Sequence, residues 1–265
     1  MTPARKSSEE AGSAAFEVVA ALTFDDIESV SSLQAEIWGS AAIAAPGTLL
    51  QVISEAGGSV LIARAGGRPV GFAYGFVGRT PAGGNYLRSH AAGVLAEYRN
   101  SGVGRALKLA QRRAALAAGL DRIVWTFDPA QVRNAHFNLR RLGAVARSFR
   151  RDYYGQRSDA LSRGLPTDRL IVEWFLGTSE EAELLRLRRR RDLVAVPVPA
   201  GLPVLPEAPP TQVEPLQALL RAGLEPRLAE GLQVIDFEVE TRSYLLARLP
   251  SWFPGLAESG PDPSA

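Results

Sequence analysis

The chain contains no cysteine and only two histidines, His90 and His136. The absence of cysteine excludes disulfides, thiolate nucleophiles, iron–sulfur clusters and zinc sites with cysteine ligands. Two histidines are too few for a metal site built from several imidazoles within one chain. We therefore expect no resident metal ion and a reaction that depends on other side chains.

A large excess of charge and long apolar runs are absent as well. The formal net charge is +2, from 30 basic and 28 acidic residues, whereas nucleic-acid and membrane-surface proteins usually carry a larger, clustered excess. No stretch of about 18 residues is uninterruptedly apolar, and residues 1–12 are polar, unlike a spanning helix or a signal peptide. These features predict a cytoplasmic protein that binds neither nucleic acid nor membrane.

What is present is a globular composition. The 265 residues are 46% hydrophobic and 22% charged, which is enough to bury the core of one large domain with a smaller annex. Changes in composition along the chain predict a domain at 15–178 and an extension at 179–250. The segments 1–14 and 251–265 are expected to be disordered tails.

Hydrophobic periodicity and turn residues predict an α+β domain. We expect strands at Phe16–Leu22, Ser59–Ala65, Val70–Val77, Tyr86–Leu95, Arg122–Phe127, Ala144–Tyr154 and Leu170–Leu176. We expect helices at Asp25–Ile37, Thr48–Ala56, Val103–Ala118 and Asn134–Leu142. The helix from Val103 has the clearest pattern, because its apolar residues recur at steps of three and four.

The extension has a different pattern. After a helix or linker at Glu180–Arg191, it is expected to contain a strand at Val194–Val198, a helix at Leu216–Gly231 and a hairpin at Val234–Leu249. The proline-rich segment Pro199–Pro215 predicts a stiff loop. The order is that of a small β-α-β-β module.

The extension also carries a run of arginines, Arg186 and Arg188–Arg191. Such a run can bind nucleic acid or an acidic partner. Glutamates at 180, 181 and 183 precede it and offset its charge. We interpret the run as a solvated helix face.

The most informative motif is the segment from Arg99 to Arg105, which follows a strand and opens the clearest helix. Gly102 and Gly104 allow a tight turn, and the N–H groups of a helix N-terminus bind anions. Arg99 and Arg105 add positive charge, so the implied ligand is a phosphate or pyrophosphate. The alternative is a glycine turn before an ordinary helix. The segment lacks the third glycine of a dinucleotide fingerprint and the Gly-Lys-Ser/Thr of a P-loop.

The order of elements together with this loop resembles the GNAT superfamily of CoA-dependent N-acyltransferases over Phe16–Gly177. Trp125–Pro129, Asp152–Gly155 and Asp168–Trp174 are similar to a bacterial branch of that family with a C-terminal extension. The resemblance implies a central mixed sheet, mostly antiparallel and splayed, flanked by helices. It also implies that the loop binds the CoA pyrophosphate and that strand backbone and one helix side chain bind the pantetheine arm. The implied CoA-binding residues are Val94, Leu95, Arg99, Asn100, Ser101, Gly102, Val103, Gly104, Arg105 and Asn134.

Acyl transfer from a thioester to an amine needs a base for the ammonium, a donor for the oxyanion and an acid for the thiolate. His90 is the candidate base, because its ordinary pKa of about 6.5 suits proton uptake near neutrality. Alternation along the strand predicts that His90 and Val94 share a face. Arg88 is expected on this face and is the candidate ligand for a substrate carboxylate. The alternative for His90 is a packed or capping histidine on a half-buried strand, and the alternative for Arg88 is a surface arginine.

Asp128, at the end of the next strand, is a candidate for binding the amine or relaying its proton, with an Asp-Pro turn as the alternative. Many members of the family have a tyrosine where this chain has Leu139, so the thiolate acid is in doubt. Tyr154, or Tyr153 beside it, is the candidate replacement; the alternatives are a reaction that needs no acid and two tyrosines that only pack in a strand. His136 is interpreted as structural.

These inferences together predict an N-acyltransferase that moves an acyl group, most simply acetyl from acetyl-CoA, to a primary amine of a small molecule such as an amino acid. One alternative is a non-catalytic CoA-sensing or partner-binding module. Another is a succinyl-CoA-dependent amino-acid N-acyltransferase. The extension is expected to cover the acceptor side or to form a homodimer.

Overall fold

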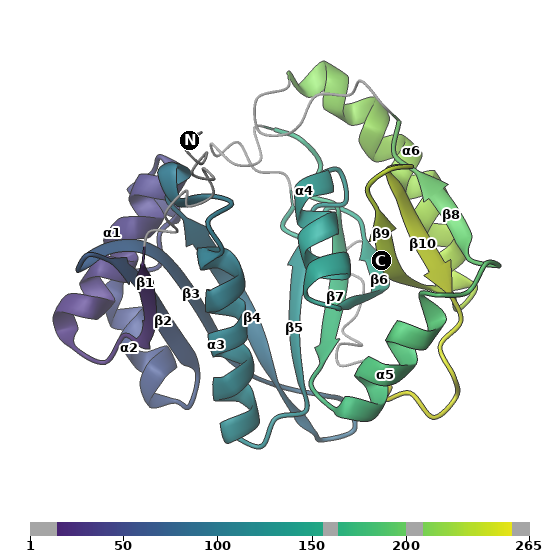
Figure 1. Ribbon diagram of the computed structural model, residues 1–265. Coiled ribbons are helices and arrows are strands. Elements are labelled where there is room, and N and C mark those ends of the chain that lie inside the picture. The colour runs from purple at the N-terminus through teal and green to yellow at the C-terminus, as the bar shows by residue number, and fades with distance from the viewer. Residues whose placement is uncertain (1–14, 156–163, 200–208, 256–265) are drawn as a thin grey trace, which may run out of the picture.

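The computed structural model describes residues 15–155, 164–199 and 209–255. In these residues ten strands form one sheet in the order β1-β2-β3-β4-β5-β7-β6-β9-β10-β8 (Figure 1). The strands are β1 (Phe16–Ala20), β2 (Ser59–Ala65), β3 (Arg68–Arg79), β4 (Asn85–Val94), β5 (Arg122–Phe127), β6 (Val145–Arg150), β7 (Arg169–Phe175), β8 (Val194–Pro197), β9 (Gln233–Glu238) and β10 (Ser243–Ala247). The main helices are α1 (Phe24–Trp38), α2 (Gly47–Glu55), α3 (Val103–Ala117), α4 (Val132–Ala135), α5 (Thr178–Leu187) and α6 (Pro210–Ala229). The predicted α+β class with a mixed sheet flanked by helices is confirmed.

The N-terminal half of the sheet lies between helices. Thr23 caps α1 through a capping box with Asp26, which fixes where the helix begins. A side chain added at Gly93 would meet Ile37 of α1, whereas one added at the neighbouring Gly71 would meet Val103 of α3. The helices α1 and α3 therefore cover opposite faces of β3 and β4.

Only one pair of neighbouring strands in the described sheet is parallel, and it is short. β4 and β5 pair at Leu87 with Ile123 and at Arg88 with Val124. Every other neighbouring pair is antiparallel. From Ser89 and Trp125 onward the two strands separate, as Figure 1 shows between α3 and α4. We call this opening the β4–β5 split; it is the splay that the resemblance implied.

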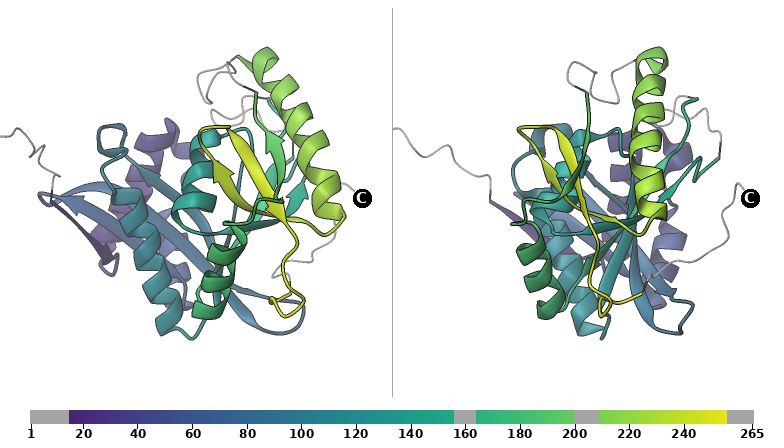
Figure 2. Two further views of the ribbon diagram at one scale, coloured as in Figure 1. Left: turned by 45° about the vertical axis from the view of Figure 1, so that its right-hand side comes forward. Right: turned by 90° about the vertical axis from the view of Figure 1, so that its right-hand side faces the viewer.

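The extension continues the same sheet. β9 joins β6 through the pair Ala146 and Val234, and β10 and β8 follow on its far side. Figure 2 shows α6 lying along these strands. The predicted β-α-β-β order is present, but the sheet crosses the predicted boundary at residue 178, and the division into two domains stays a prediction.

Three element boundaries differ from the sequence-based expectation by four residues or more. α6 begins at Pro210, inside the segment predicted to be a loop, and it contains Pro215 and Pro226. Proline at the first helical position is favourable. The interior prolines are tolerated because a stripe of leucines on this helix is buried: Leu216, Leu220, Leu224 and Leu228. β6 ends at Arg150 rather than Tyr154, and α5 ends at Leu187 rather than Arg191.

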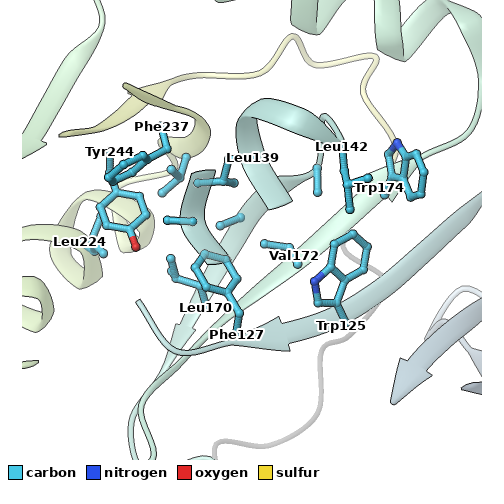
Figure 3. Packing of buried hydrophobic residues seen from close by; sticks show 14 of the residues in the cluster. Trp125, Phe127, Leu139, Leu142, Leu170, Val172, Trp174, Leu224, Phe237 and Tyr244 are labelled. Carbon is cyan, nitrogen blue, oxygen red and sulfur yellow. The ribbon is translucent and has the colours of Figure 1, made fainter. Parts of the chain in front are cut away.

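The largest hydrophobic cluster lies under α4 and α6, and Figure 3 shows part of it. Trp125 and Trp174 meet edge to face, with ring centroids 6.5 Å apart. Leu139 is fully buried in this cluster. The residue at the position of the family's tyrosine is therefore a core residue here.

The first residues of the predicted C-terminal tail are packed against the sheet. Phe253 is buried and its ring lies edge to face with that of Phe175, 4.8 Å between centroids. Arg122 and Arg147 donate hydrogen bonds to the carbonyls of Gly255 and Pro254. Residues 251–255 are thus packed rather than disordered. Residues 1–14 and 256–265, the other predicted tail segments, lie outside the described residues. In the described residues, none of the helices has the length and apolar character needed to cross a membrane.

Candidate functional site

The loop before α3 has the backbone of an anion site. Asn100 has φ 65° and Gly102 has φ 93°, both in the left-handed region, where asparagine and glycine are the most tolerant residues. Gly102 is the N-cap of α3, and no side chain caps this helix. The first N–H groups of the helix therefore have no intrahelical acceptor. They lie at the open end of the β4–β5 split.

Positive side chains surround this loop. Arg99 and Arg105 are exposed, and in the described residues neither forms an ion pair with a carboxylate. Arg133 of α4 reaches across and donates from Nη2 to Asn100 Oδ1 at 3.3 Å. Asn134 is exposed beside it and donates to Gln131 Oε1 at 3.2 Å. The sequence did not indicate Arg133, although its position next to Asn134 could have.

The strand backbone leading to the loop is only partly available. The Leu95 N–H donates to Val70 O at 3.0 Å, so it is already used in pairing with β3. Because an antiparallel ladder alternates, Val94 directs its N–H and C=O toward the opposite side, where Arg99 Nε lies 3.5 Å from Val94 O. Of the two predicted backbone donors, Val94 faces the β4–β5 split and Leu95 does not.

His90 lies at a β-bulge in β4. Tyr74 pairs with Ala91 and Gly75 pairs with Ser89, so His90 is the extra residue. Its ring lies 5.5 Å from that of Tyr74 and 5.9 Å from that of Phe76. Burial, and secondarily the charge of Arg88, lower the pKa of His90.

The bulge also changes which residues share a face. Tyr74, beside His90, points toward Gln34 of α1, 3.4 Å from Tyr74 OH to Gln34 Oε1. Val94 points toward α3, since a side chain at Gly104 would lie 3.8 Å from its Cγ2. The expectation that His90 and Val94 share a face is therefore wrong, because one inserted residue reverses the alternation.

On the His90 face, two tyrosines from the turn after β6 approach the β4–β5 split. Arg88 Nη2 donates to Tyr153 OH at 3.0 Å, and the Tyr154 hydroxyl lies 3.1 Å from Thr126 Oγ1 of β5. The two tyrosine rings meet edge to face, 4.7 Å between centroids. The structure thus brings Arg88, His90 and Tyr154 to one face of the sheet. Thr126 was missed, although alternation places it on the same face of β5 as Asp128.

Asp128 follows β5 and closes a turn. Its Oδ1 accepts the Ala130 N–H at 2.8 Å, and its carbonyl accepts the Gln131 N–H at 3.0 Å. Burial raises the pKa of its carboxyl group. The Asp-Pro turn weighed as an alternative is therefore present, and it occupies one carboxyl oxygen.

A buried polar cluster lies behind the point where β4 and β5 separate. Lys108 of α3 is 5% exposed, with Nζ 2.9 Å from Ser89 Oγ and 3.1 Å from Gln111 Oε1. The ammonium also lies 3.9 Å from the centroid of the Trp125 ring. Burial lowers the pKa of Lys108 to about 7. Sequence reasoning did not single out this residue.

The comparisons with known proteins agree with this geometry. Residues 27–144 match the model of the acetyltransferase (GNAT) family. The match spans the β4–β5 split, His90 and the loop before α3. No protein with a curated description matches the chain.

Two solved structures have a similar fold. One is the acetyltransferase of the GNAT family from Streptococcus pneumoniae, with a TM-score of 0.50 and 13% identity, covering 62% of this chain and 100% of that chain. The other is the N-acetyltransferase from Staphylococcus aureus Mu50, with a TM-score of 0.50 and 14% identity, covering 62% of this chain and 99% of that chain. More than a third of this chain therefore has no counterpart in either structure.

Proposed function

We propose that this chain, whose residues 27–144 match the model of the GNAT acetyltransferase family, is an enzyme that transfers an acetyl group from acetyl-CoA to the primary amine of a small molecule. The observation that carries the proposal is the uncapped N-terminus of α3, with left-handed Asn100 and Gly102, at the open end of the β4–β5 split. In this proposal the pyrophosphate binds the helix N–H groups. Arg99, Arg105 and Arg133 balance its charge.

The proposed reaction path follows the β4–β5 split. The pantetheine arm lies along β4, where Val94 offers a backbone N–H, so the thioester points toward Ser89. The acceptor approaches from the His90 face. His90 takes the proton from the ammonium, and the free amine attacks the thioester carbonyl. As the tetrahedral intermediate collapses, the carbon–sulfur bond breaks and Tyr154 gives a proton to the leaving thiolate. The Tyr154 phenolate then takes the remaining extra proton from the nitrogen, which leaves the neutral amide.

An amino acid is the proposed class of acceptor. Arg88 lies on the His90 face, and its charge reaches far enough to lower the pKa of His90. A carboxylate on the acceptor is attracted to this charge and brings the amine close to His90. The same attraction applies to a carboxylate on the acyl group, so succinyl-CoA belongs in the donor screen. Asp128, on the same side, is proposed to attract the ammonium group.

The test of the CoA site is calorimetry with CoA, acetyl-CoA and succinyl-CoA. Replacing Gly104 by leucine is expected to weaken binding at least tenfold, because the new side chain extends toward Val94, where the pantetheine arm is proposed to lie. The fold should tolerate the change, since an added Cβ at Gly104 meets only ordinary contact. Ala117→Leu, at the exposed far end of the same helix, is the control and should bind like the wild type. If the folded wild type binds none of the three ligands, the proposal is wrong. Binding without thiol release in an amine screen would favour a CoA-sensing module.

The role of His90 predicts a pH profile. Because its pKa is lowered, kcat/KM should fall on acidification with a midpoint below the ordinary value of about 6.5. His90→Gln should lower kcat about 100-fold and remove this limb of the profile. His136→Gln changes the other histidine of the chain and should leave kcat and the acid limb of the profile unchanged. An acid limb that survives in His90→Gln would assign the base to another group.

A further inference from the structure

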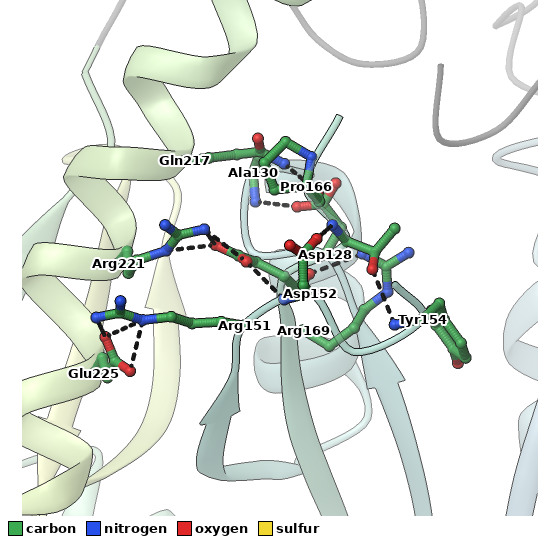
Figure 4. Close-up of polar contacts among 12 residues, drawn as sticks. Asp128, Ala130, Arg151, Asp152, Tyr154, Pro166, Arg169, Gln217, Arg221 and Glu225 are labelled. Carbon is green, nitrogen blue, oxygen red and sulfur yellow. Dashed lines mark hydrogen bonds and ion pairs between the residues drawn. The ribbon is translucent and has the colours of Figure 1, made fainter. Parts of the chain in front are cut away.

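The longest helix of the extension is anchored to the start of β7 by a buried ion pair. Arg221 of α6 donates to Asp168 from Nε at 3.0 Å and from Nη2 at 2.9 and 2.8 Å (Figure 4). The Asp168 side chain is 1% exposed and that of Arg221 is 29% exposed. A bidentate ion pair of this kind fixes the orientation of both groups as well as their distance.

Asp168 in turn holds the turn that follows β6. Its Oδ1 accepts the Asp152 N–H at 3.1 Å, and Asp152 Oδ1 accepts the Thr167 N–H at 3.0 Å. Asp152 has φ 44°, a left-handed conformation that persists only where surrounding contacts impose it. The ion pair with α6 is therefore coupled to the backbone of this turn.

The same turn presents the two tyrosines. The Tyr153 N–H donates to Thr167 O at 3.1 Å, and the Tyr154 N–H donates to Thr167 Oγ1 at 2.9 Å. Beyond the backbone, the Tyr153 hydroxyl meets Arg88 of β4 and the Tyr154 hydroxyl meets Thr126 of β5. These hydrogen bonds, together with the side chains of Tyr153 and Tyr154, thus connect α6 to both strands of the β4–β5 split.

A second contact of α6 supports the same segment. Gln217 Nε2 donates to Pro166 O at 2.9 Å, one turn of helix before Arg221. By contrast, the pair between Arg151 and Glu225 is at the surface, with side chains 53% and 34% exposed. The buried contacts hold the segment 166–168, whereas the exposed pair holds only the start of the turn.

We propose that Arg221 is a positioning residue for the acceptor side of the active site, acting through Asp168 and the turn at Asp152 to hold Tyr153 and Tyr154 beside the β4–β5 split. This role rests on the proposed function, because it assigns the acceptor to the face of His90 and the tyrosines. It gives the extension a part in acceptor binding. None of the hydrogen bonds that link Arg221 to the two tyrosines involves the loop from Arg99 to Arg105, where CoA is proposed to bind.

The experiment compares Arg221→Met with Arg221→Lys, which retains the positive charge but cannot form the bidentate contact with Asp168. Glu225→Gln is the control. Hydrogen exchange of the Tyr153 and Tyr154 amides is measured by mass spectrometry of peptides covering residues 150–155. The KM values for acetyl-CoA and for the amino acid turned over fastest in a panel of the standard amino acids are measured by thiol release.

We expect exchange at the two amides to rise at least tenfold in Arg221→Met and less in Arg221→Lys. We expect the KM for the amino acid to rise about fivefold to tenfold, with the KM for acetyl-CoA unchanged. Glu225→Gln should match the wild type in amide exchange and in both KM values.

Unchanged exchange in folded Arg221→Met and Arg221→Lys would overturn the proposal, and so would faster exchange with an unaltered KM for the amino acid. If no amino acid is turned over, the acceptor class in the proposed function is wrong. Exchange still decides whether Arg221 positions the tyrosines.

Discussion

Raising the pH from 7 to 10 should stabilise this protein by about 3 kcal/mol through Lys108 alone. Burial lowers the pKa of Lys108 to about 7 in the folded chain, against about 10.4 when unfolded. Between these values the unfolded chain binds more protons, so the free energy of unfolding rises with pH. The chain has no cysteine and its only other lysine is Lys6. Burial raises the pKa of Tyr74 to about 12 and that of Tyr244 as well, so these two tyrosines oppose the effect only as pH 10 is approached. Chemical denaturation at several pH values measures it.

The matching variant is Lys108→Met, which should unfold with a much flatter pH dependence. The change removes the ammonium but leaves the bond from Ser89 Oγ to Gln111 Oε1, 2.9 Å, intact. At pH 7 the variant should therefore be more stable than the wild type. Arg113→Met, on the exposed face of the same helix, should retain the pH dependence of the wild type. A wild-type stability that is constant from pH 7 to 10 would show that Lys108 is hydrated in the folded protein.

The second large effect is expected at Glu173, where substitution by glutamine should lower the free energy of unfolding by about 3–5 kcal/mol. The side chain of Glu173 is 1% exposed and lies 3.0 Å from Arg122 Nη1 and 3.9 Å from Arg147 Nη1. Removing this charge leaves the largely buried Arg147 with no carboxylate within ion-pair distance among the described residues, whereas Arg122 still pairs with Asp121, 2.9 Å from its Nε. Burial already lowers the pKa of Arg147, a sign that its charge is poorly solvated.

The control for this prediction is Glu225→Gln, which breaks an exposed arginine–glutamate pair. Exposed pairs contribute at most about 1 kcal/mol, so this variant should unfold close to the wild type. Urea denaturation of both variants beside the wild type gives the comparison. If both variants lose the same small amount of unfolding free energy, the ion pairs of Glu173 with Arg122 and Arg147 do not stabilise the fold as expected. A secondary expectation is looser packing of residues 251–255, because Arg122 and Arg147 also hold their carbonyls.

The sequence predicted most of the fold because its local signals agree with one another. Thr23 and Asp26 mark the start of α1, and the positive φ angles of Gly66 and Gly67 suit the short turn between the predicted strands Ser59–Ala65 and Val70–Val77. The start of α6 was missed because prolines at 209 and 210 are typical of loops. A helix beginning at Pro210 depends on the leucines that it buries against the extension strands, and a local pattern does not reveal such tertiary contacts.

The candidate site was predictable in its residue types and less so in its arrangement. The loop from Arg99 to Gly104 was found because glycines, a helix start and charge coincide within a few residues. The bulge at His90 was not, since the residues around His90 in β4 do not mark it and only the pairing with Tyr74 and Gly75 of β3 defines it. The roles of Lys108 and Arg221 depend on contacts with residues distant in sequence, such as Trp125 and Asp168.

The ten-stranded sheet bears on how copies of this chain can associate. Its described edges are β1, five residues long, and β8, four residues long and ending at Pro197. Short edge strands, and proline without an N–H donor, offer few hydrogen bonds to a strand from another molecule. By covering the edge of β6 with three more strands, the extension replaces a longer edge by one of four residues. We therefore expect β-type aggregation to be opposed at the C-terminal edge of the sheet.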